Sequence, residues 1–326
     1  MKKLFFTLVA LVCATMSYAQ NILVATLTHG DSISMYYGTY ALRDALAAAE
    51  DGDVINLSGG SFQSTGIKKA VIIRGTGIDD ANPTYISGDY TIEIPEESNS
   101  SRLTMEGIRC TGTTYMQGFE NPLFLKCQFY RLYFNRANAN NASFINCKVT
   151  DEAEVTYYAS GIAMQFVNSI INDFKSYNTD IGSFTFINSI LISSAWACSY
   201  SYLLNCIVCS PSSNYLPSTS VAINCIGIRY NIFSGSPSNT GCGTSTYEEL
   251  FKDFTGTYSD KQTFELTDEA KTKYLGNDGT QVGWYGGVKP YTSTPSYPQI
   301  TKMNVANKTT TDGKLSVEIE VSAAAE

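Results

Sequence analysis

A four-residue phrase returns six times in the middle of the chain, and its spacing restricts the fold more than any other feature. Each copy ends an apolar segment with a corner residue, usually asparagine, followed by cysteine or serine. The copies are Phe124–Cys127, Phe144–Cys147, Phe166–Ser169, Phe186–Ser189, Leu203–Cys206 and Ala222–Cys225. Their first residues are 20, 22, 20, 17 and 19 positions apart. This period, rich in β-branched and aromatic residues and without helical periodicity, predicts a solenoid of β-coils.

The corner asparagines explain how such coils stack. Asparagine tolerates a left-handed backbone and hydrogen-bonds nearby backbone groups. Because coils stack about 4.8 Å apart, one asparagine per coil can form a ladder whose amides bond one another and the turn backbone. The same frame points Phe144, Cys147 and Val149 inward and Lys148 outward. Extended towards the N-terminus, it places Gly107 at a corner, where glycine permits positive φ.

This coil pattern resembles that of the right-handed parallel β-helix proteins of the pectate-lyase-like superfamily, over most of the chain. The expected fold class is therefore all-β, a single-stranded parallel β-helix with ~20-residue coils and an N-terminal capping helix. A β-sandwich with coincidental spacing is the alternative. The closing pattern around Gly276–Gly287 is similar to that of β-helix proteins exported by Bacteroidetes-type bacteria. The resemblance implies a fold and carries no activity with it.

The first 19 residues have the pattern of a secretory signal peptide. Lys2 and Lys3 precede the apolar stretch Leu4–Val12, and Ser17–Ala19 provides a small-residue cleavage site before Gln20. We therefore expect a secreted, periplasmic or surface-displayed protein that is not an integral membrane protein. The expected organisation is a signal peptide (1–19), a β-helix with its cap (20–290), and a linker with a hairpin-like cap or attachment segment (291–326).

Local patterns predict how the solenoid begins and ends. A strand at 22–27, a polar stretch through residue 37 and an amphipathic helix at about 40–50 would cover the first coil. Residues 231–246 are rich in Gly, Ser and Asn and are expected to form a loop. A final coil is expected to begin at Thr263 and end at Gly287, with Trp284 and Tyr285 covering its exposed interior.

Charge and cysteine usage limit the partners. The net charge of −8 argues against binding nucleic acid or an anionic membrane surface, and we expect a monomer that binds polysaccharide. Cys127 and Cys147 share one position on adjacent coils, as do Cys206 and Cys225, within the Cα distance of a disulfide. Since serine fills the same column at 169 and 189, we favour a column of small interior residues over disulfides.

One outward column contains the candidate chemistry. Arg131, Asp151 and Asp173 each lie five residues after a corner. The functional interpretation is a calcium site at Asp151 and Asp173, with Arg131 for a sugar carboxylate and Lys175 or Arg131 as a general base, Lys175 requiring a lowered pKa. The structural interpretation is an exposed Arg131–Asp151 pair, with a bulge in the 22-residue coil that separates Asp151 from Asp173. Glu152, Glu154 and Asp180 could complete the cluster.

Negative evidence leaves the question of enzyme activity open. Between Ile181 and Tyr247 the one charged residue is Arg229, so these coils cannot supply the carboxylate pair of a glycosidase. No Ser-His-Asp order, phosphate-binding loop or metal-ligand spacing is visible. If the protein is an enzyme, a polysaccharide lyase is expected rather than a hydrolase.

Aromatic residues complete the list of candidates for ligand binding. Tyr and Trp offer flat faces to sugar C–H groups and a polar edge, although many aromatic residues of a β-coil are partly buried in its stacks. The best placed are Tyr157, Tyr158, Tyr133, Tyr177 and Trp196. The expected function is binding, or weak degradation, of polysaccharide. The alternatives are a structural or adhesive surface spacer and a calcium-dependent lyase.

Overall fold

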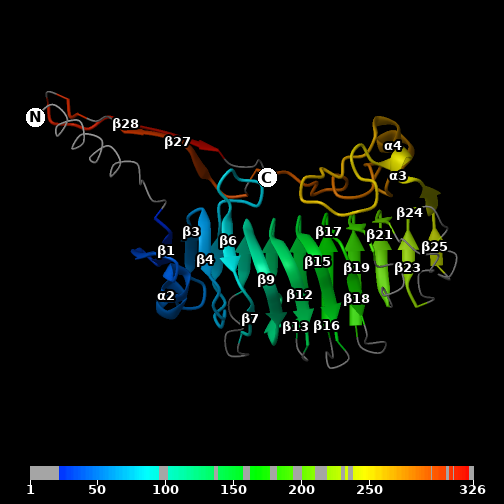
Figure 1. The fold of residues 1–326 in the computed structure, drawn as a ribbon, viewed down its shortest axis with the longest axis horizontal. Coiled ribbons are helices and arrows are strands. Elements are labelled where there is room, and N and C mark those ends of the chain that lie inside the picture. The colour runs from blue at the N-terminus through cyan, green and yellow to red at the C-terminus, as the bar shows by residue number, and fades with distance from the viewer. Residues whose placement is uncertain are drawn as a thin grey trace, which may run out of the picture.

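The computed structural model of the chain is a parallel β-solenoid of about seven turns (Figure 1). It describes residues 22–94, 102–135, 139–156, 162–176, 182–193, 200–209, 219–228, 232–233, 238–294, 296–305, 308–310 and 312–322. The expected signal peptide, residues 1–19, lies outside the described residues. Within these ranges no helix has the length and apolar character needed to cross a bilayer. The predicted all-β fold of stacked, ~20-residue coils is confirmed.

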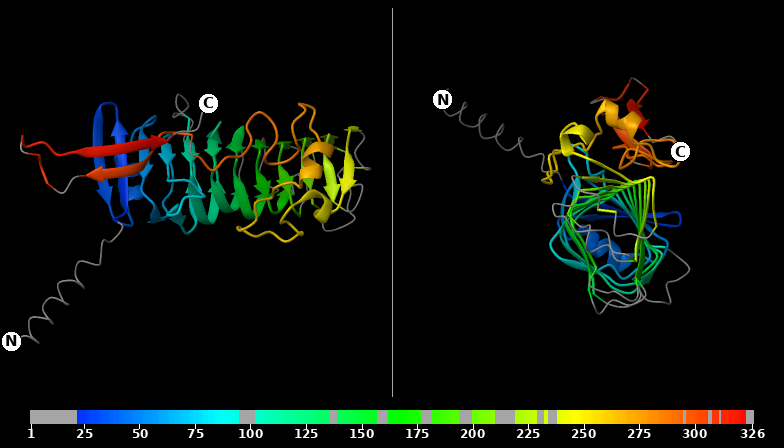
Figure 2. Two further views of the ribbon diagram at one scale, coloured as in Figure 1. Left: turned by 90° about the horizontal axis from the view of Figure 1, so that it is seen from above. Right: turned by 90° about the vertical axis from the view of Figure 1, so that its right-hand side faces the viewer.

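Two long sheets, A and B, extend along the solenoid and enclose its interior, as the view down the axis shows (Figure 2, right). In hydrogen-bonding order, sheet A comprises β2 (Ser32–Tyr37), β1 (Val24–His29), β3 (Val54–Leu57), β5 (Ile72–Arg74), β8 (Thr104–Glu106), β11 (Leu123–Leu125), β14 (Ala142–Ile145), β16 (Ile162–Val167), β19 (Gly182–Ile187), β21 (Ser201–Leu204), β23 (Val221–Ile223) and β25 (Ser238–Thr240). Sheet B comprises β26 (Gly243–Ser245), β24 (Ile226–Ile228), β22 (Ile207–Val208), β20 (Ile190–Leu191), β17 (Ile170–Ile171), β15 (Lys148–Val155), β12 (Gln128–Phe134), β9 (Ile108–Met116), β6 (Thr84–Ser87) and β4 (Gly60–Gln63), with β18 (Phe174–Ser176) beside β15 and β7 (Tyr90–Ile92) beside β9. A short pair, β10 (Phe119–Glu120) and β13 (Ala139–Asn140), lies outside both sheets.

The corner residues have the left-handed backbone that the repeat predicts. Lys126 and the five asparagines of the phrase have φ between 45° and 56°, and Gly107 has φ of 67°. Gly241 continues the series with φ of 66°, in register with Asn224 through the pairing of β23 with β25. The loop expected at residues 231–246 is therefore wrong in part, because β25 and β26 build one more coil. A glycine corner with polar neighbours hid this copy of the phrase.

The interior is a stack of identical positions on successive coils. Phe124, Phe144, Phe166 and Phe186 are fully buried, and consecutive rings lie 4.8, 4.6 and 5.6 Å apart with nearly parallel planes. The parallel register of sheet A places each ring directly above the last. Such ring pairs stabilise a fold by roughly 0.5–1.5 kcal/mol each beyond their buried area.

The cysteine column is confirmed as a set of small interior residues. Cys127, Cys147, Cys206 and Cys225 are buried free thiols. Each thiol donates to a backbone carbonyl of the preceding coil or of its own coil, as Cys147 does to Phe124 O at 3.4 Å. Ser169 donates to Phe144 O in the same way, at 3.2 Å. Burial raises the pKa of the Cys147 thiol to about 12, so this thiol stays protonated and unreactive.

The N-terminal end is closed by a helix and a hairpin. Helix α2 (Ala41–Ala48) lies at this end of the solenoid (Figure 1) and buries the expected face, Leu42, Leu46 and Ala49. The polar stretch before it is a strand, β2, which pairs antiparallel with β1 and becomes the edge of sheet A. Serine alternates with Ile33 and Met35 in the first part of this strand, as is typical of a β-strand. The predicted capping helix is confirmed, and a strand is added to the cap.

The expected final coil is wrong, because residues 247–298 fold back along the outside of the solenoid. We call these residues the return segment; it contains α3 (Tyr247–Leu250) and α4 (Asp268–Lys273) and lies along one side of the solenoid (Figures 1 and 2). It buries a row of outward side chains from sheet B, namely Ile170, Ile190, Ile207 and Ile226. Trp284 belongs to this outer cluster instead of covering the last coil.

The corner ladder holds the return segment in place. Asn205 Oδ1 accepts the N–H of Asn277 at 3.1 Å. Asn168 donates to Trp284 O and Gly286 O at 2.9 and 2.7 Å. Further along, Lys126 donates to Thr294 O, and Glu106 accepts the N–H of Ser296 at 3.0 Å. The segment therefore passes the corners in reverse order. Beyond it, β27 (Gln299–Val305) and β28 (Val317–Ser322) pair antiparallel.

Candidate functional site

The predicted charged column forms part of a larger polar surface on the outer face of sheet B. The strands β9, β12, β15 and β18 (Figure 1) are neighbours in this sheet, and the pairing register places two rows of outward side chains across them. We call them together the polar ladder. The first row contains Thr113, Arg131, Glu152 and Asp173, and the second contains Tyr115, Tyr133, Glu154 and Lys175.

A bulge in β15 changes which residues meet. The register steps from Phe129 opposite Val149 to Arg131 opposite Glu152, so β15 contains one residue more than β12. Asp151 lies in this bulge, and Glu152 takes the place between Arg131 and Asp173 that five-residue counting gave to Asp151. The bulge predicted for the 22-residue coil is present. It displaces Asp151 from the column by one residue.

The cations of the ladder are already bound by carboxylates. Arg131 donates two hydrogen bonds to Asp151 Oδ2, at 2.7 and 3.1 Å. Lys175 Nζ lies 2.9 Å from Glu152 and 3.1 Å from Asp173. The structural interpretation of Arg131 and Asp151 as a partly exposed ion pair is thus confirmed. Such pairs contribute about 0–1 kcal/mol, so they position side chains more than they stabilise the fold.

Protonation in the ladder follows from these contacts. The hydrogen bond to Glu152, and then the contact with Asp173, raise the pKa of Lys175 despite partial burial. A neutral lysine base needs the opposite shift. Partial burial opposes ionisation of both glutamates. The pKa of Glu152 is nevertheless lowered, because Lys175 donates to it and the charges of Lys175 and Arg131 stabilise its ionised form. The pKa of Glu154 is raised by burial and by its contact with Glu152.

Aromatic rings adjoin these carboxylates at one end. Tyr133 lies opposite Glu154, and its ring meets the ring of Tyr115 edge to face at 5.7 Å. Both tyrosines are half-buried. Tyr133 was among the predicted residues, whereas Tyr115 was not singled out because the bulges of β9 and β15 shift the spacing. The other predicted aromatic residues, Tyr157, Tyr158, Tyr177 and Trp196, lie outside the described residues, as does Asp180.

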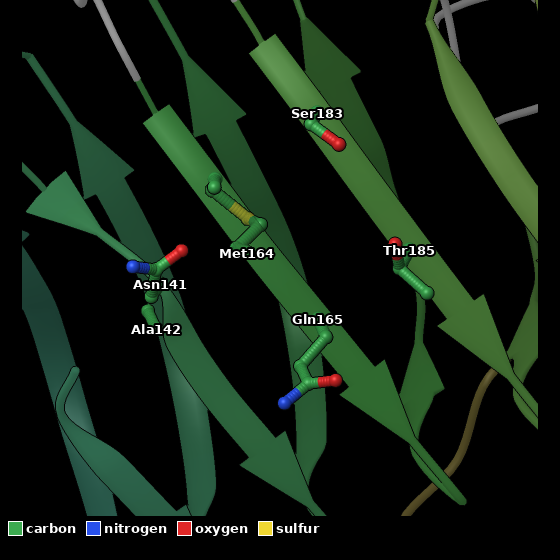
Figure 3. A pocket seen from close by; sticks show the side chains of 7 residues that line it. Asn141, Ala142, Met164, Gln165, Ser183 and Thr185 are labelled. Carbon is green, nitrogen blue, oxygen red and sulfur yellow. The ribbon is translucent and has the colours of Figure 1, made fainter.

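A second surface, on the outer face of sheet A, was not predicted. A hollow of about 260 Å³ is lined by Asn141, Gln165, Ser183 and Thr185 on neighbouring coils, with Met164 between them (Figure 3). Gln165 donates to Ser143 at 2.7 Å, and Tyr202 lies beside Thr185 in register. Its lining contains no charged side chain. The absence of charge between residues 181 and 228 was the one sequence signal for such a face.

Metal binding stays a prediction. In the described ranges, no group of three or more His, Cys, Asp or Glu side chains is arranged to hold a metal ion. Asp151 is engaged by Arg131, and the Lys175 ammonium lies against Asp173. Calcium at Asp151 and Asp173 would require both cations to move away from these carboxylates.

The fold places the chain in the class of parallel β-solenoid proteins. Comparisons with protein-family models, with curated proteins and with solved structures returned no match to this chain.

Proposed function

We propose that the protein binds a neutral glycan at the polar ladder. The observation that carries the proposal is the row Tyr115, Tyr133, Glu154 and Lys175, in which tyrosine rings adjoin a carboxylate. Ring faces pack against sugar C–H groups, and carboxylates accept hydrogen bonds from sugar hydroxyls. Parallel coils about 4.8 Å apart repeat these contacts along a linear ligand.

The charges of the ladder select the class of glycan. Two cations, Arg131 and Lys175, face four carboxylates, namely Asp151, Glu152, Glu154 and Asp173, and both cations are bound by them. An acidic polysaccharide would meet an excess of like charge. Carboxylates instead suit the hydroxyl groups of an uncharged sugar, from which they accept hydrogen bonds.

The proposal also includes export of the protein and its resemblance to a known group of β-helix proteins. The signal-peptide pattern of residues 1–19 supports secretion to the periplasm, the medium or the cell surface. The coil pattern, together with the solenoid fold, supports a resemblance to exported β-helix proteins of the pectate-lyase-like superfamily. This resemblance is one of architecture, and the ladder described above carries the functional proposal by itself.

Affinity electrophoresis of the protein from Gln20 onwards, in gels containing neutral or acidic polysaccharides, tests the proposal. We expect a neutral polymer to retard migration without being degraded. Tyr133→Ala and Glu154→Gln should each weaken retardation about tenfold, because each removes one ring face or one charged acceptor. Tyr130→Ala is the matched control, since Tyr130 is exposed on the same strand outside both rows.

Three outcomes would contradict neutral-glycan binding at the ladder. Retardation by acidic polymers alone would contradict the choice of ligand. Loss of retardation in Gln165→Ala, with Tyr133→Ala unaffected, would move the site to the hollow of sheet A. Polymer clearing that requires calcium would favour the lyase and return attention to Asp151 and Asp173.

A rigid spacer is the second candidate, and one observation favours it. The stacked phenylalanines and the return segment brace the solenoid along its length. Such a rod needs no ligand. Unchanged migration in every gel would leave the spacer as the better proposal.

A further inference from the structure

We propose that an apolar groove beside the return segment binds a free fatty acid. The groove is a hollow of about 450 Å³ on the outer face of sheet A, within the range of about 300–1,000 Å³ typical of small-molecule sites. Its floor is one row of partly exposed aliphatic side chains from successive coils, namely Ile145, Val167, Ile187 and Leu204. The pairing of β14, β16, β19 and β21 places these side chains in register, so the floor is straight.

The return segment forms the wall of the groove and leaves the floor open. On the sheet B side of the corners, the segment buries an aliphatic row that includes Ile170 and Ile190. On the sheet A side it bonds to the corner asparagines, as Asn277 does to Asn205, but the adjoining aliphatic row stays partly exposed. Val288, in the wall, is 93% exposed. Aliphatic surface of both the floor and the wall is therefore available to a ligand.

The chemistry of the floor selects an alkyl chain. The four aliphatic side chains have no hydrogen-bonding group, so a sugar hydroxyl or a peptide group placed on them would lose its bonds to water without replacement. A peptide strand also presents side chains to one face about every 6.6 Å, whereas the floor repeats about every 4.8 Å. An unbranched alkyl chain has neither constraint. The floor is roughly 14 Å long, which is the length of an extended chain of about a dozen carbon atoms.

A cation lies at one end of the groove. Lys289 lines the groove and is exposed. In the orientation that satisfies its hydrogen bonds, the Asn146 amide donates to Lys289 O at 3.3 Å, which places Lys289 at the Ile145 end. Among the described residues, no carboxylate lies within ion-pairing distance of the Lys289 ammonium. The ammonium can therefore bind the acid group of a ligand whose chain lies on the floor.

The other end of the groove disfavours an acid group. The bond between Asn277 and the Asn205 corner places the neighbouring Asp278 at the Leu204 end. The Asp278 carboxylate accepts the N–H and the hydroxyl of Thr280 at 3.0 and 2.8 Å, and its charge would repel an anion. The groove thus fits a ligand that is anionic at one end and aliphatic along its length, which is the chemistry of a fatty acid.

Isothermal titration of the protein from Gln20 onwards with dodecanoate, below its micellar concentration, tests this site. We expect dodecanoate to bind, and decanoate and octanoate to bind about fourfold more weakly for each methylene removed. Lys289→Gln should weaken dodecanoate binding about three- to fivefold, because the head group loses an exposed ion pair. Lys261→Gln is the matched control, since Lys261 is an exposed lysine of the return segment that does not line the groove.

A second pair of variants tests the floor. Val167→Thr replaces a methyl group by a hydroxyl and should weaken dodecanoate binding about fivefold or more, because the alkyl chain would cover a polar group. Val221→Thr is the matched control, since Val221 is partly exposed on sheet A, opposite Tyr202, and does not line the groove. Melting curves of the variants identify any loss that comes from misfolding.

Several results would overturn the inference. Failure of dodecanoate to bind, equal affinity for octanoate and dodecanoate, or binding that survives both Lys289→Gln and Val167→Thr would each do so. Sedimentation with phosphatidylcholine vesicles, without binding of monomeric dodecanoate, would assign the groove to a membrane surface instead. This inference does not depend on the polar ladder: Tyr133→Ala should leave dodecanoate binding unchanged.

Discussion

At the residue scale, one repeated position serves two purposes. Asn168 and Asn188 occupy the same corner on adjacent coils, with φ of 45° and 47°. Both adopt the left-handed backbone conformation that asparagine tolerates, which explains why asparagine recurs at this position in the sequence. Asn168 also donates two hydrogen bonds to the return segment, whereas the Nδ2 group of Asn188 has no partner. The repeat predicted the shared conformation but could not predict the unequal bonding, which depends on residues more than 100 positions away.

The first prediction separates these two purposes. Asn168→Gly keeps the left-handed backbone but removes both donors, so we expect the free energy of unfolding to fall by about 1–3 kcal/mol. Asn188→Gly makes the same change at a corner whose Nδ2 is unpaired. It should therefore lower the free energy of unfolding by less. Urea unfolding of the two variants measures the difference. Equal destabilisation would show that the bonds to the return segment contribute nothing.

The second prediction concerns pH and the N-terminal cap. A hydrogen bond to Asp53, and then its charge, raise the pKa of His29 above 6.5. The stabilising contact is therefore fully present below the ordinary histidine pKa and is lost as pH rises through the raised value. We expect His29→Gln to lower the melting temperature at pH 5.5 and to leave it unchanged at pH 9. A difference of the same size at both pH values would contradict this assignment.

At the scale of elements, the sequence predicted the position of the central strands well. It predicted only in part which residues pair across strands and which segments cover them. The six copies of the phrase located the central strands of sheet A and the inward faces of Phe144 and Val149. One extra residue in β15 then changed the polar ladder, because a bulge alters every later pairing. Lys148 points outward as predicted, yet it is buried between Asp79, Trp284 and Tyr291. Periodicity gives the direction of a side chain and cannot say what covers it.

The third prediction tests the packing of the return segment. Trp284 is buried against Tyr291, with ring centres 3.9 Å apart. Trp284→Ala should lower the free energy of unfolding by about 3–5 kcal/mol. Trp284→Phe should cost much less, because it keeps a ring and removes an indole N–H that has no partner. The control is Val288→Ala, a change at a side chain that is 93% exposed, which should stay within about 0.5 kcal/mol of the parent. Denaturant titrations compare all three.

At the scale of the whole molecule, the return segment joins coils that would otherwise contact only their neighbours. Solenoid stability is ordinarily a sum over adjacent repeats. Here one segment forms hydrogen bonds to coils along the solenoid, from the Asn205 corner to the carbonyl of Gly75. Its outward targets, such as Ile190 and Ile207, resemble interior isoleucines in the sequence, so no local pattern distinguishes them. The repeat could predict the solenoid but not the brace along it.

The fourth prediction concerns cooperativity. We expect the parent chain to unfold in one calorimetric transition, with equal calorimetric and van 't Hoff enthalpies. Combining Asn168→Gly with Trp284→Ala should loosen the brace and make the calorimetric enthalpy exceed the van 't Hoff value, because groups of coils then unfold separately. An unbroadened transition in the double variant would contradict the bracing role.

The return segment also imposes an order on folding. Contacts between adjacent coils join residues about 20 positions apart, whereas those of the return segment join residues 38 to 222 apart. Closing long loops is slow, and these residues follow the coils in the chain, so the coils stack first during synthesis. Until the segment docks, the isoleucine row of sheet B faces water. Aggregation during synthesis should therefore begin at that row, in molecules whose coils are already formed.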